Sequence, residues 1–277
     1  MARVFITGSS DGLGRGAAQL LVQQGHSVVL HARDERRAKE AMAAVPGAQA
    51  AVIGDLSSVV QTRSVADQVN GLGSFDAVIH NAGVGYREAR RIETEDGLPH
   101  VFAVNTLAPF LLTALIQRPK RLVYLSSGLH QSGDASLKDL AWKERPWRGQ
   151  QAYSDTKLHD VILAFAIARL WPDVFSNALE PGWVPTKMGG AGATDDLQQG
   201  YETQAWLAVS EDAAAKVTGE YFYHMRPRKP HPAARDQGKQ DMLLEACERF
   251  SGVKMAGVLK AGQSGEERTA LTPTPNQ

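Results

Sequence analysis

The chain has 277 residues, and its 30 basic and 30 acidic side chains cancel, which argues against nucleic acid or a membrane surface as its main partner. Cys247 is the only cysteine, so an intramolecular disulfide is excluded, and a zinc site would need histidine and carboxylate ligands alone. The first apolar stretch is too short for a signal peptide and the longest, at 161–168, is too short to span a bilayer, so we expect a cytoplasmic protein that binds a small molecule.

Short apolar runs alternate with helical patterns along the chain. We expect the runs to form strands at 3–7, 27–32, 48–53, 75–80, 121–126, 174–179 and 219–224. Strands that helices cover on both faces read as continuous Val, Ile and Leu runs, as these do. The alternation therefore predicts one α/β domain over residues 1–253, a doubly wound sheet of about seven parallel strands with helices on both faces. Residues 254–277 are rich in small, polar and charged residues and are expected to form a poorly ordered tail.

Three segments interrupt this rhythm. Residues 131–150 form a polar stretch with two tryptophans, Trp142 and Trp147, and the glycine-rich stretch after Thr186 is typical of a mobile loop. Residues 226–235 are basic and Pro-rich, and they fit a plain exposed loop better than an arm at an oligomer contact. The loop tryptophans could line a pocket, although loop aromatics more often cover the core.

A glycine-rich turn follows the first expected strand and opens the first expected helix. Glycine there allows a tight turn and the close approach of a pyrophosphate, whose charge is favoured by free amides and the positive end of the helix dipole. A purely structural turn would also explain the glycines, but their place at the start of a βαβ unit favours a dinucleotide site. The residues expected to form it are Gly8, Ser9, Ser10, Gly12, Leu13 and Gly14.

The end of the second expected strand bears on which dinucleotide binds. An acidic residue there would bind the ribose 2′-hydroxyl, whereas an arginine accommodates a 2′-phosphate. The strand ends in Arg33 with no carboxylate before it, which favours NADP(H) over NAD(H), although Asp34 and Asp11 could repel the extra phosphate. Asp55, followed by Leu56, could accept from the adenine amino group, and an N-cap role for it is equally open.

Tyr153 and Lys157 lie four positions apart in an expected helix, so both side chains project from one face. A phenol has a pKa of about 10, and a fixed cation beside it favours the phenolate and lowers that pKa. Such a pair could serve in acid–base catalysis. A packed tyrosine and a solvated lysine would explain the spacing equally well.

These features occur together with others in a fixed order. The chain has T-G-x-x-x-G-x-G at 7–14, Asp55-Leu56, Asn81-Ala82-Gly83, Asn105, Ser126-Ser127, Tyr-x-x-x-Lys at 153–157 and Pro181-Gly182 followed by Thr186. Their order and spacing over about residues 1–225 resemble the single-domain form of the short-chain dehydrogenase/reductase family, which has a Rossmann-type fold. The interval of 26 positions from Ser127 to Tyr153 is about twice the family's usual one. It resembles the branch with retinol dehydrogenases and protochlorophyllide reductases, which favour NADP.

The resemblance implies a catalytic group of Asn105, Ser127, Tyr153 and Lys157, in which Ser127 rather than Ser126 matches the family's serine. Tyr153 would exchange a proton with the substrate oxygen, and Ser127 would hold that oxygen. Lys157 would also reach the nicotinamide ribose, and Asn105 would hold a water.

The resemblance also extends the cofactor site. It implies that Asn81, Ala82 and Gly83 steady the central strands beside the cofactor, and that Thr186 meets the nicotinamide amide. Further residues expected at the cofactor are Pro181, Gly182 and Val184. The family often forms dimers or tetramers, so a homodimer or homotetramer is expected.

The leading interpretation is thus an NADP(H)-dependent oxidoreductase for a carbonyl or alcohol substrate. The alternative is a nucleotide-binding regulator or scaffold on the same fold, which would be expected to lose Tyr153 or Lys157. An epimerase or dehydratase of the extended type would space its glycines differently and carry a larger C-terminal region. Fold and motifs do not predict which carbonyl or alcohol is the substrate.

Overall fold

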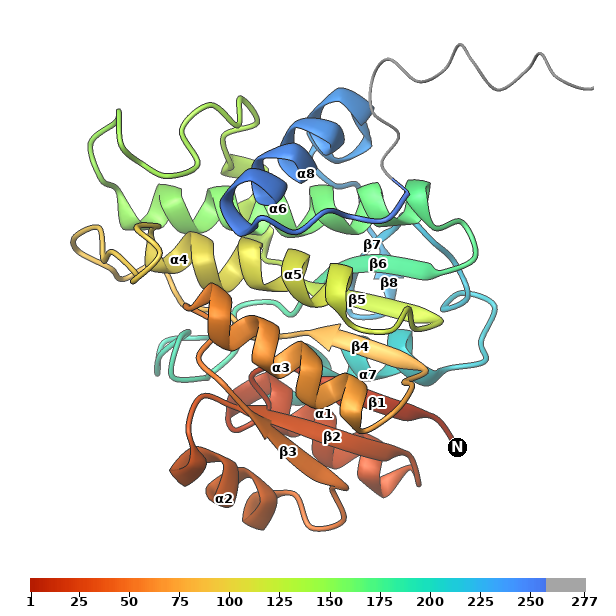
Figure 1. Ribbon diagram of the computed structural model, residues 1–277. Helices are drawn as coiled ribbons and strands as arrows, with labels where there is room; N and C mark the ends of the chain where they lie inside the picture. Colours follow the sequence, from red (N-terminus) through yellow and green to blue (C-terminus); the bar gives the residue numbers. More distant parts are fainter. Residues whose placement is uncertain (258–277) are drawn as a thin grey trace, which may run out of the picture.

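The computed structural model describes residues 1–257, which are arranged around one central sheet (Figure 1). The strands in this part of the chain are β1 (Arg3–Ile6), β2 (Ser27–Ala32), β3 (Ala50–Ile53), β4 (Ala77–His80), β5 (Arg121–Leu125), β6 (Phe175–Glu180), β7 (Tyr221–Tyr223) and β8 (Arg226–Pro227). They hydrogen-bond in the order β3-β2-β1-β4-β5-β6-β7-β8, and each neighbouring pair as far as β7 is parallel. The predicted sheet of about seven parallel strands is therefore confirmed, and β8 adds an antiparallel strand at one edge.

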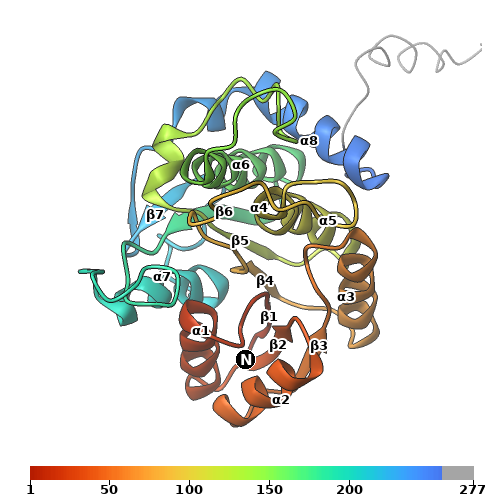
Figure 2. The same cartoon turned by 90° about the vertical axis from the view of Figure 1, so that its left-hand side faces the viewer.

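Helices cover both faces of the sheet. The α-helices are α1 (Gly12–Gln23), α2 (Glu35–Ala44), α3 (Val59–Gly71), α4 (His100–Phe102), α5 (Ala108–Leu115), α6 (Gly149–Leu170), α7 (Leu197–Val209) and α8 (Gln237–Ser251). Figure 2 shows α1 and α7 on one side of the sheet, and α3, α5 and α6 on the other. A π-helical turn, η1 (Ala103–Leu107), joins α4 to α5, and short 3₁₀ turns form η2 (Gly128–Ser132) and η3 (Pro232–Arg235). Within residues 1–257, no helix is both long and apolar enough to cross a bilayer.

The winding of the sheet reverses at β1. This strand pairs with β2 on one side and β4 on the other, so that Val4 lies beside both Val28 and Ala77. Because the chain leaves β1 toward one side and returns at β4 on the other, the loops after these two strands part at their carboxyl ends. Open α/β sheets bind their ligands in the crevice that forms there.

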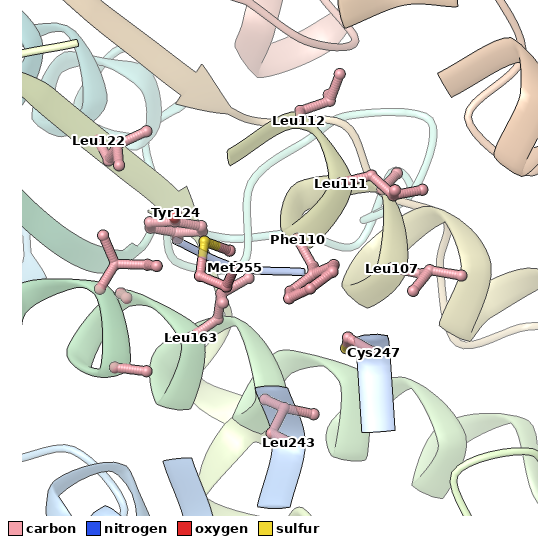
Figure 3. Close-up of a cluster of buried hydrophobic side chains, with 14 of the residues drawn as sticks. Leu107, Phe110, Leu111, Leu112, Leu122, Tyr124, Leu163, Leu243, Cys247 and Met255 are labelled. Atoms are coloured by element: carbon pink, nitrogen blue, oxygen red, sulfur yellow. The ribbon is translucent and has the colours of Figure 1, made fainter. Parts of the chain in front are cut away.

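The larger apolar core lies between the sheet and the layer of α3, α5, α6 and α8. Figure 3 shows side chains from β5, α5, α6 and α8 meeting in it, among them Phe110 and Leu163. Met255, in the segment predicted to be a tail, is 3% exposed and packs into the same core. The Trp171 indole N–H also donates to the Ala256 carbonyl oxygen at 3.0 Å. The chain is therefore packed this far, and the rest of the predicted tail, 258–277, lies outside the described residues.

Residues 226–235 differ from the plain exposed loop that the sequence predicts. They include both β8 and η3. The Arg228 guanidinium pairs with Glu180 at 2.9 Å, and Ala233 and Ala234 are buried where η3 packs on α6. Two small apolar residues thus anchor a segment whose composition is otherwise polar and basic.

Candidate active site

A cavity of about 430 Å³ opens where the parallel strands end, and it reaches from the end of β2 to α6. The predicted site residues that line it are Gly8, Ser10, Gly12, Leu13, Arg33, Asp55, Leu56, Asn81, Ala82, Gly83, Tyr153, Lys157, Pro181 and Thr186. Within the described part of the chain, its lining does not include the predicted residues Ser9, Gly14, Asn105, Ser127, Gly182 and Val184. One continuous space therefore joins the predicted dinucleotide loop to the Tyr153–Lys157 pair.

The glycine loop after β1 is packed too closely to carry side chains at two positions. Gly8 has a φ of +61°, and a Cβ there would lie 2.8 Å from the Ala82 Cα. A Cβ on Gly14 would lie 2.4 Å from Asn81 Nδ2, so Gly14 allows α1 to approach the end of β4. The contact of Gly14 with a pyrophosphate stays a prediction. Gly8 and Gly12 have no side chains and line the cavity at the start of α1, a position that suits a pyrophosphate.

Two buried residues hold this loop from beneath. The Ser9 hydroxyl donates to the Ile6 carbonyl oxygen at 2.9 Å and accepts from the His31 backbone N–H at 2.8 Å. The His31 ring accepts from the Gly8 N–H through Nδ1 (3.0 Å), so its proton is on Nε2, which donates to the Gly54 carbonyl oxygen (2.9 Å). Burial lowers the pKa of His31 to about 4. Sequence reasoning missed His31, because its apolar strand gives no sign of these partners.

Basic side chains gather where the cavity reaches the end of β2. Arg33 lines the cavity with its side chain 64% exposed, and Arg37 lines it from the first turn of α2. Arg37 Nη2 donates to the Ser10 hydroxyl at 3.0 Å and lies 3.8 Å from Asp11. Asp11 also pairs with Lys187, whose hydrogen bond lowers the pKa of that carboxyl below its usual value. Asp11, one of the two carboxylates expected to repel a 2′-phosphate, therefore has its negative charge offset by Arg37 and Lys187. Sequence reasoning singled out neither of these two cations.

Asp55 lies at the cavity wall after β3 and does not cap α3. Its Oδ1 accepts from the Ser57 backbone N–H at 2.9 Å. The residue that caps α3 is Ser58, whose hydroxyl accepts from the Gln61 N–H. Of the two roles open for Asp55, the N-cap is therefore wrong.

Asn81 ties the ends of β1 and β4 together. Its Nδ2 donates to the carbonyl oxygens of Thr7 (2.9 Å) and Gly8 (3.1 Å). The Thr7 hydroxyl in turn accepts from the backbone N–H groups of Asn81 (3.0 Å) and Ala82 (2.9 Å). These bonds fix the wall of the cavity between the two central strands.

Asn105 is fully buried in the π-helical turn η1. Its Oδ1 accepts from the Val84 N–H at 2.8 Å, and its Nδ2 donates to the Val84 carbonyl oxygen and to the Thr156 hydroxyl, both at 3.0 Å. Asn105 thereby links the segment after β4 to the helix that carries Tyr153. Single π-helical turns are frequent at functional sites.

Tyr153 and Lys157 share one face of α6, with Lys157 Nζ 5.7 Å from the centroid of the Tyr153 ring. Tyr153 is 6% exposed, and its hydroxyl donates to Met188 Sδ at 3.8 Å. Burial raises the pKa of Tyr153 above its usual value, and the Lys157 ammonium and the Ser127 hydroxyl act against that rise. The expectation of a lowered phenol pKa is therefore wrong, because the cost of burying a charge outweighs the nearby cation.

Lys157 is itself buried and is held by two acceptors. Its Nζ donates to the Leu125 carbonyl oxygen at 2.7 Å and to Asp160 Oδ2 at 2.8 Å. Burial acts to lower the pKa of Lys157, but Asp160 and Tyr153 together raise it above its usual value. Sequence reasoning missed Asp160, although its spacing of three residues from Lys157 on one helix was a signal that could have found it.

The two serines that follow β5 have different surroundings. The Ser126 hydroxyl donates to the Lys157 carbonyl oxygen at 2.7 Å, so it braces α6 against the sheet. Ser127 caps η2, and its hydroxyl is close enough to Tyr153 to lower the pKa of the phenol. Ser126 lines the cavity and Ser127 does not, so the choice of Ser127 over Ser126 as the catalytic serine stays a prediction.

Aromatic side chains cover Tyr153. The Tyr86 ring meets it edge-on with centroids 5.7 Å apart, and Trp142 and Trp147 pack on each other at 5.1 Å in the same cluster. Among residues 1–257, the cavity lining includes neither these two tryptophans nor Trp183. Trp142 and Trp147 thus belong to a small buried apolar cluster, which agrees with the expectation that loop aromatics cover the core.

The residues around the cavity fit an adenine dinucleotide. A glycine backbone and the start of α1 form its middle, and the guanidiniums of Arg33 and Arg37 supply positive charge at one end. The buried pair of Tyr153 and Lys157 lies at the other end. These groups are the kinds that phosphates and a hydroxyl-bearing ribose require.

Known proteins are similar to this chain over most of its length. The short chain dehydrogenase family pattern matches residues 2–126. Uncharacterized oxidoreductase AN7799 of Emericella nidulans is 46% identical and spans 93% of this chain and 100% of its own length. Short-chain dehydrogenase chry4 of Gibberella zeae is 42% identical and spans 92% of this chain and 99% of its own length.

A crystal structure of an uncharacterised protein from Mycobacterium paratuberculosis has the same fold. Its TM-score is 0.79 at 24% identity, over 92% of this chain and 95% of that chain. Retinol dehydrogenases 13 and 14 of Homo sapiens are also among the relatives, which confirms the predicted resemblance to that branch. The chain therefore belongs to the short-chain dehydrogenase/reductase family.

Proposed function

We propose that this protein is an NADP(H)-dependent oxidoreductase that interconverts a carbonyl group and an alcohol, with Asn105, Ser127, Tyr153 and Lys157 as its catalytic group. The observation that carries the proposal is the single cavity that joins the glycine loop to the buried pair of Tyr153 and Lys157. NADPH, when bound, supplies the hydride for the carbonyl carbon.

The side chains of this protein would manage the proton. Tyr153 is a neutral phenol at physiological pH, so it can give its proton to a carbonyl oxygen and take one back from an alcohol. Ser127 would donate to the same oxygen and hold it in line with the phenol. Lys157 would bind the nicotinamide ribose while it stabilises the phenolate that is left after proton transfer. Asn105 would hold the segment after β4 against α6 through its bonds to Val84 and Thr156, and so fix the position of the Tyr153 phenol.

The preference for NADP(H) rests on two arginines. Arg33 and Arg37 both line the cavity at the end of β2, and Asp11 beside them is offset by Lys187. Guanidinium groups bind phosphate in a bidentate manner, and the ribose 2′-phosphate is the group that distinguishes NADP from NAD.

The test is a panel of aldehydes, ketones and quinones with NADPH and then NADH, followed by cofactor absorbance. Relatives named as retinol dehydrogenases and as a daunorubicin C-13 ketoreductase of Streptomyces support including a polyene aldehyde and a polycyclic ketone. Turnover by the wild type that Tyr153→Phe abolishes would support the proposal. Cofactor binding without turnover across the panel would favour the regulator instead, and binding of neither cofactor would overturn both.

A further inference from the structure

Asp160 is the partner of Lys157 and lies one helical turn beyond it on α6. The Lys157 side chain is 5% exposed and the Asp160 side chain is 4% exposed. The distance from Lys157 Nζ to Asp160 Oδ2 is 2.8 Å. A second bond from Nζ goes to the Leu125 carbonyl oxygen at 2.7 Å. Since an ammonium has three N–H donors, these two acceptors orient the group and leave a third donor for the cavity that Lys157 lines.

Asp160 also changes the field at Tyr153. The Lys157 ammonium, 5.7 Å from the Tyr153 ring, acts to lower the pKa of the phenol, whereas the Asp160 carboxylate acts to raise it. Both charges are buried, so solvent screens them little. The pair therefore presents Tyr153 with a much weaker positive field than a lone lysine would.

We propose that Asp160 is a positioning residue that orients the Lys157 ammonium toward the cofactor ribose and keeps Tyr153 a protonated phenol, ready to donate to a carbonyl oxygen. The inference rests on the proposed function, because it assigns Tyr153 and Lys157 their roles in proton transfer. It adds to the site a residue that sequence reasoning missed.

The other titratable groups around this pair are neutral or paired. The Asp160 carboxylate acts to raise the pKa of Tyr124 on β5. Tyr86, in the loop after β4, acts to raise the pKa of Tyr153, and Tyr153 acts to raise that of Tyr221 on β7. Burial raises the pKa of both Tyr124 and Tyr221. Further charged or titratable groups nearby, within residues 1–257, include His159 on α6, which burial keeps neutral. His130 on η2 and Glu180 on β6 lie beside Tyr221, and Asp155 pairs with Arg145. Asp160 is thus the negative charge closest to the ammonium that Tyr153 senses.

The test compares wild type with Asp160→Asn, which keeps the shape of the side chain and removes its charge. Tyrosinate absorbance is titrated for each protein without cofactor, against the same protein carrying Tyr153→Phe, so that the difference reports the ionisation of Tyr153. We expect the midpoint to fall by about one pH unit in Asp160→Asn. The alkaline limb of the pH profile for carbonyl reduction should move down by the same amount. The KM for NADPH should rise severalfold because the ammonium loses its orientation.

Asp155→Asn is the matched control, because Asp155 is another buried, paired carboxylate on α6 (2.6 Å from Arg145). It should leave the Tyr153 midpoint where it is in wild type. A midpoint in Asp160→Asn that is unchanged or higher would overturn the inference. If Asp160→Asn does not fold, Asp160→Ser, which leaves room for a water beside Nζ, carries the same expectation.

The two proposals fail separately. Absence of turnover in wild type across the substrate panel counts against the oxidoreductase. The absorbance titration needs neither turnover nor cofactor, so it tests the effect of Asp160 on Tyr153 in either case.

Discussion

The Tyr153 hydroxyl donates to the sulfur of Met188 across 3.8 Å, so a residue of the loop after β6 stands where the substrate oxygen must come in the proposed reaction. A thioether is a weak acceptor, and a carbonyl oxygen would replace it at little cost. The same side chain packs against the backbone at Gly85, where an added Cβ would lie 2.8 Å from Met188 Cγ. Met188 thus links the loop to the reacting hydroxyl.

Met188→Ala should lower the KM for bulky carbonyl substrates by roughly 3- to 10-fold, since about 1 kcal/mol of displacement is no longer needed. Steady-state kinetics with a small and a large ketone measure the effect, and the large one should gain more. Met225→Ala, at an exposed methionine on the β7–β8 hairpin, is the control and should change neither KM. Equal KM values for Met188→Ala and wild type would show that the loop side chain does not compete with substrate.

Tyr153→Phe should reduce kcat by at least about 100-fold, because the proton donor is lost while the ring remains. The free energy of unfolding should change by less than about 1 kcal/mol, since the variant removes the weak hydrogen bond from the phenol to sulfur. Stopped-flow or steady-state turnover gives the first quantity and urea denaturation the second. A variant that keeps a tenth of the wild-type kcat would remove Tyr153 from its role.

Arg33→Asp should reverse the cofactor preference toward NADH, because the new carboxylate would accept a hydrogen bond from the ribose 2′-hydroxyl and would repel a 2′-phosphate. Arg37→Ala should weaken NADPH about 10-fold or more while changing NADH little, the usual size of a lost hydrogen bond to a charged group. The ratio of kcat/KM for the two cofactors measures both effects. Arg36→Ala is the matched control, since Arg36 sits between them in sequence but pairs with Glu40 on the exposed side of α2. A ratio that does not move in either variant contradicts the assignment.

The free energy of unfolding should fall as the pH is lowered from 6.5 to about 4. Burial lowers the pKa of His31 from 6.5 to about 4, so the unfolded chain binds its proton first and protonation favours unfolding across that interval. Stability from the neutral ring is fully present above pH 6.5 and is lost as the pH falls toward the folded pKa. Buried His80 and His159, each with a pKa lowered to about 3, add losses in the same direction. Urea denaturation at several pH values should show this decline in the free energy of unfolding, and the decline should be smaller in His31→Gln. A free energy of unfolding that does not change with pH in wild type would contradict the neutral state of these rings.

Local sequence patterns predicted most of the strands and helices and part of the candidate site. Val, Ile and Leu runs bounded by glycines marked the strands, and the four-residue spacing of Tyr153 and Lys157 placed both on one face of α6. Each of these patterns involves residues that are close together in the chain, so it can be read from one sequence without knowledge of the fold. β8 was missed because two residues with a proline carry no strand pattern.

The contacts that sequence reasoning missed join elements far apart in the chain. Arg37 reaches Ser10 only because α2 folds back beside the glycine loop, and Lys187 reaches Asp11 from the loop after β6, 176 positions along the chain. His31 supports Gly8 because β2 lies beside β1. The net pKa of Tyr153 depends on burial, which the spacing of a lysine does not report.

The pairing of β8 with β7 bears on how the sheet meets other chains. Free strand edges are templates for edge-to-edge aggregation, and proteins protect them with short strands, proline and basic side chains. β8 has all three features: it is two residues long, Pro227 lacks an N–H, and Arg226 is exposed beside it. Growth of the sheet by addition of a strand from a second molecule is therefore disfavoured at this end, and the hairpin acts as a built-in terminator.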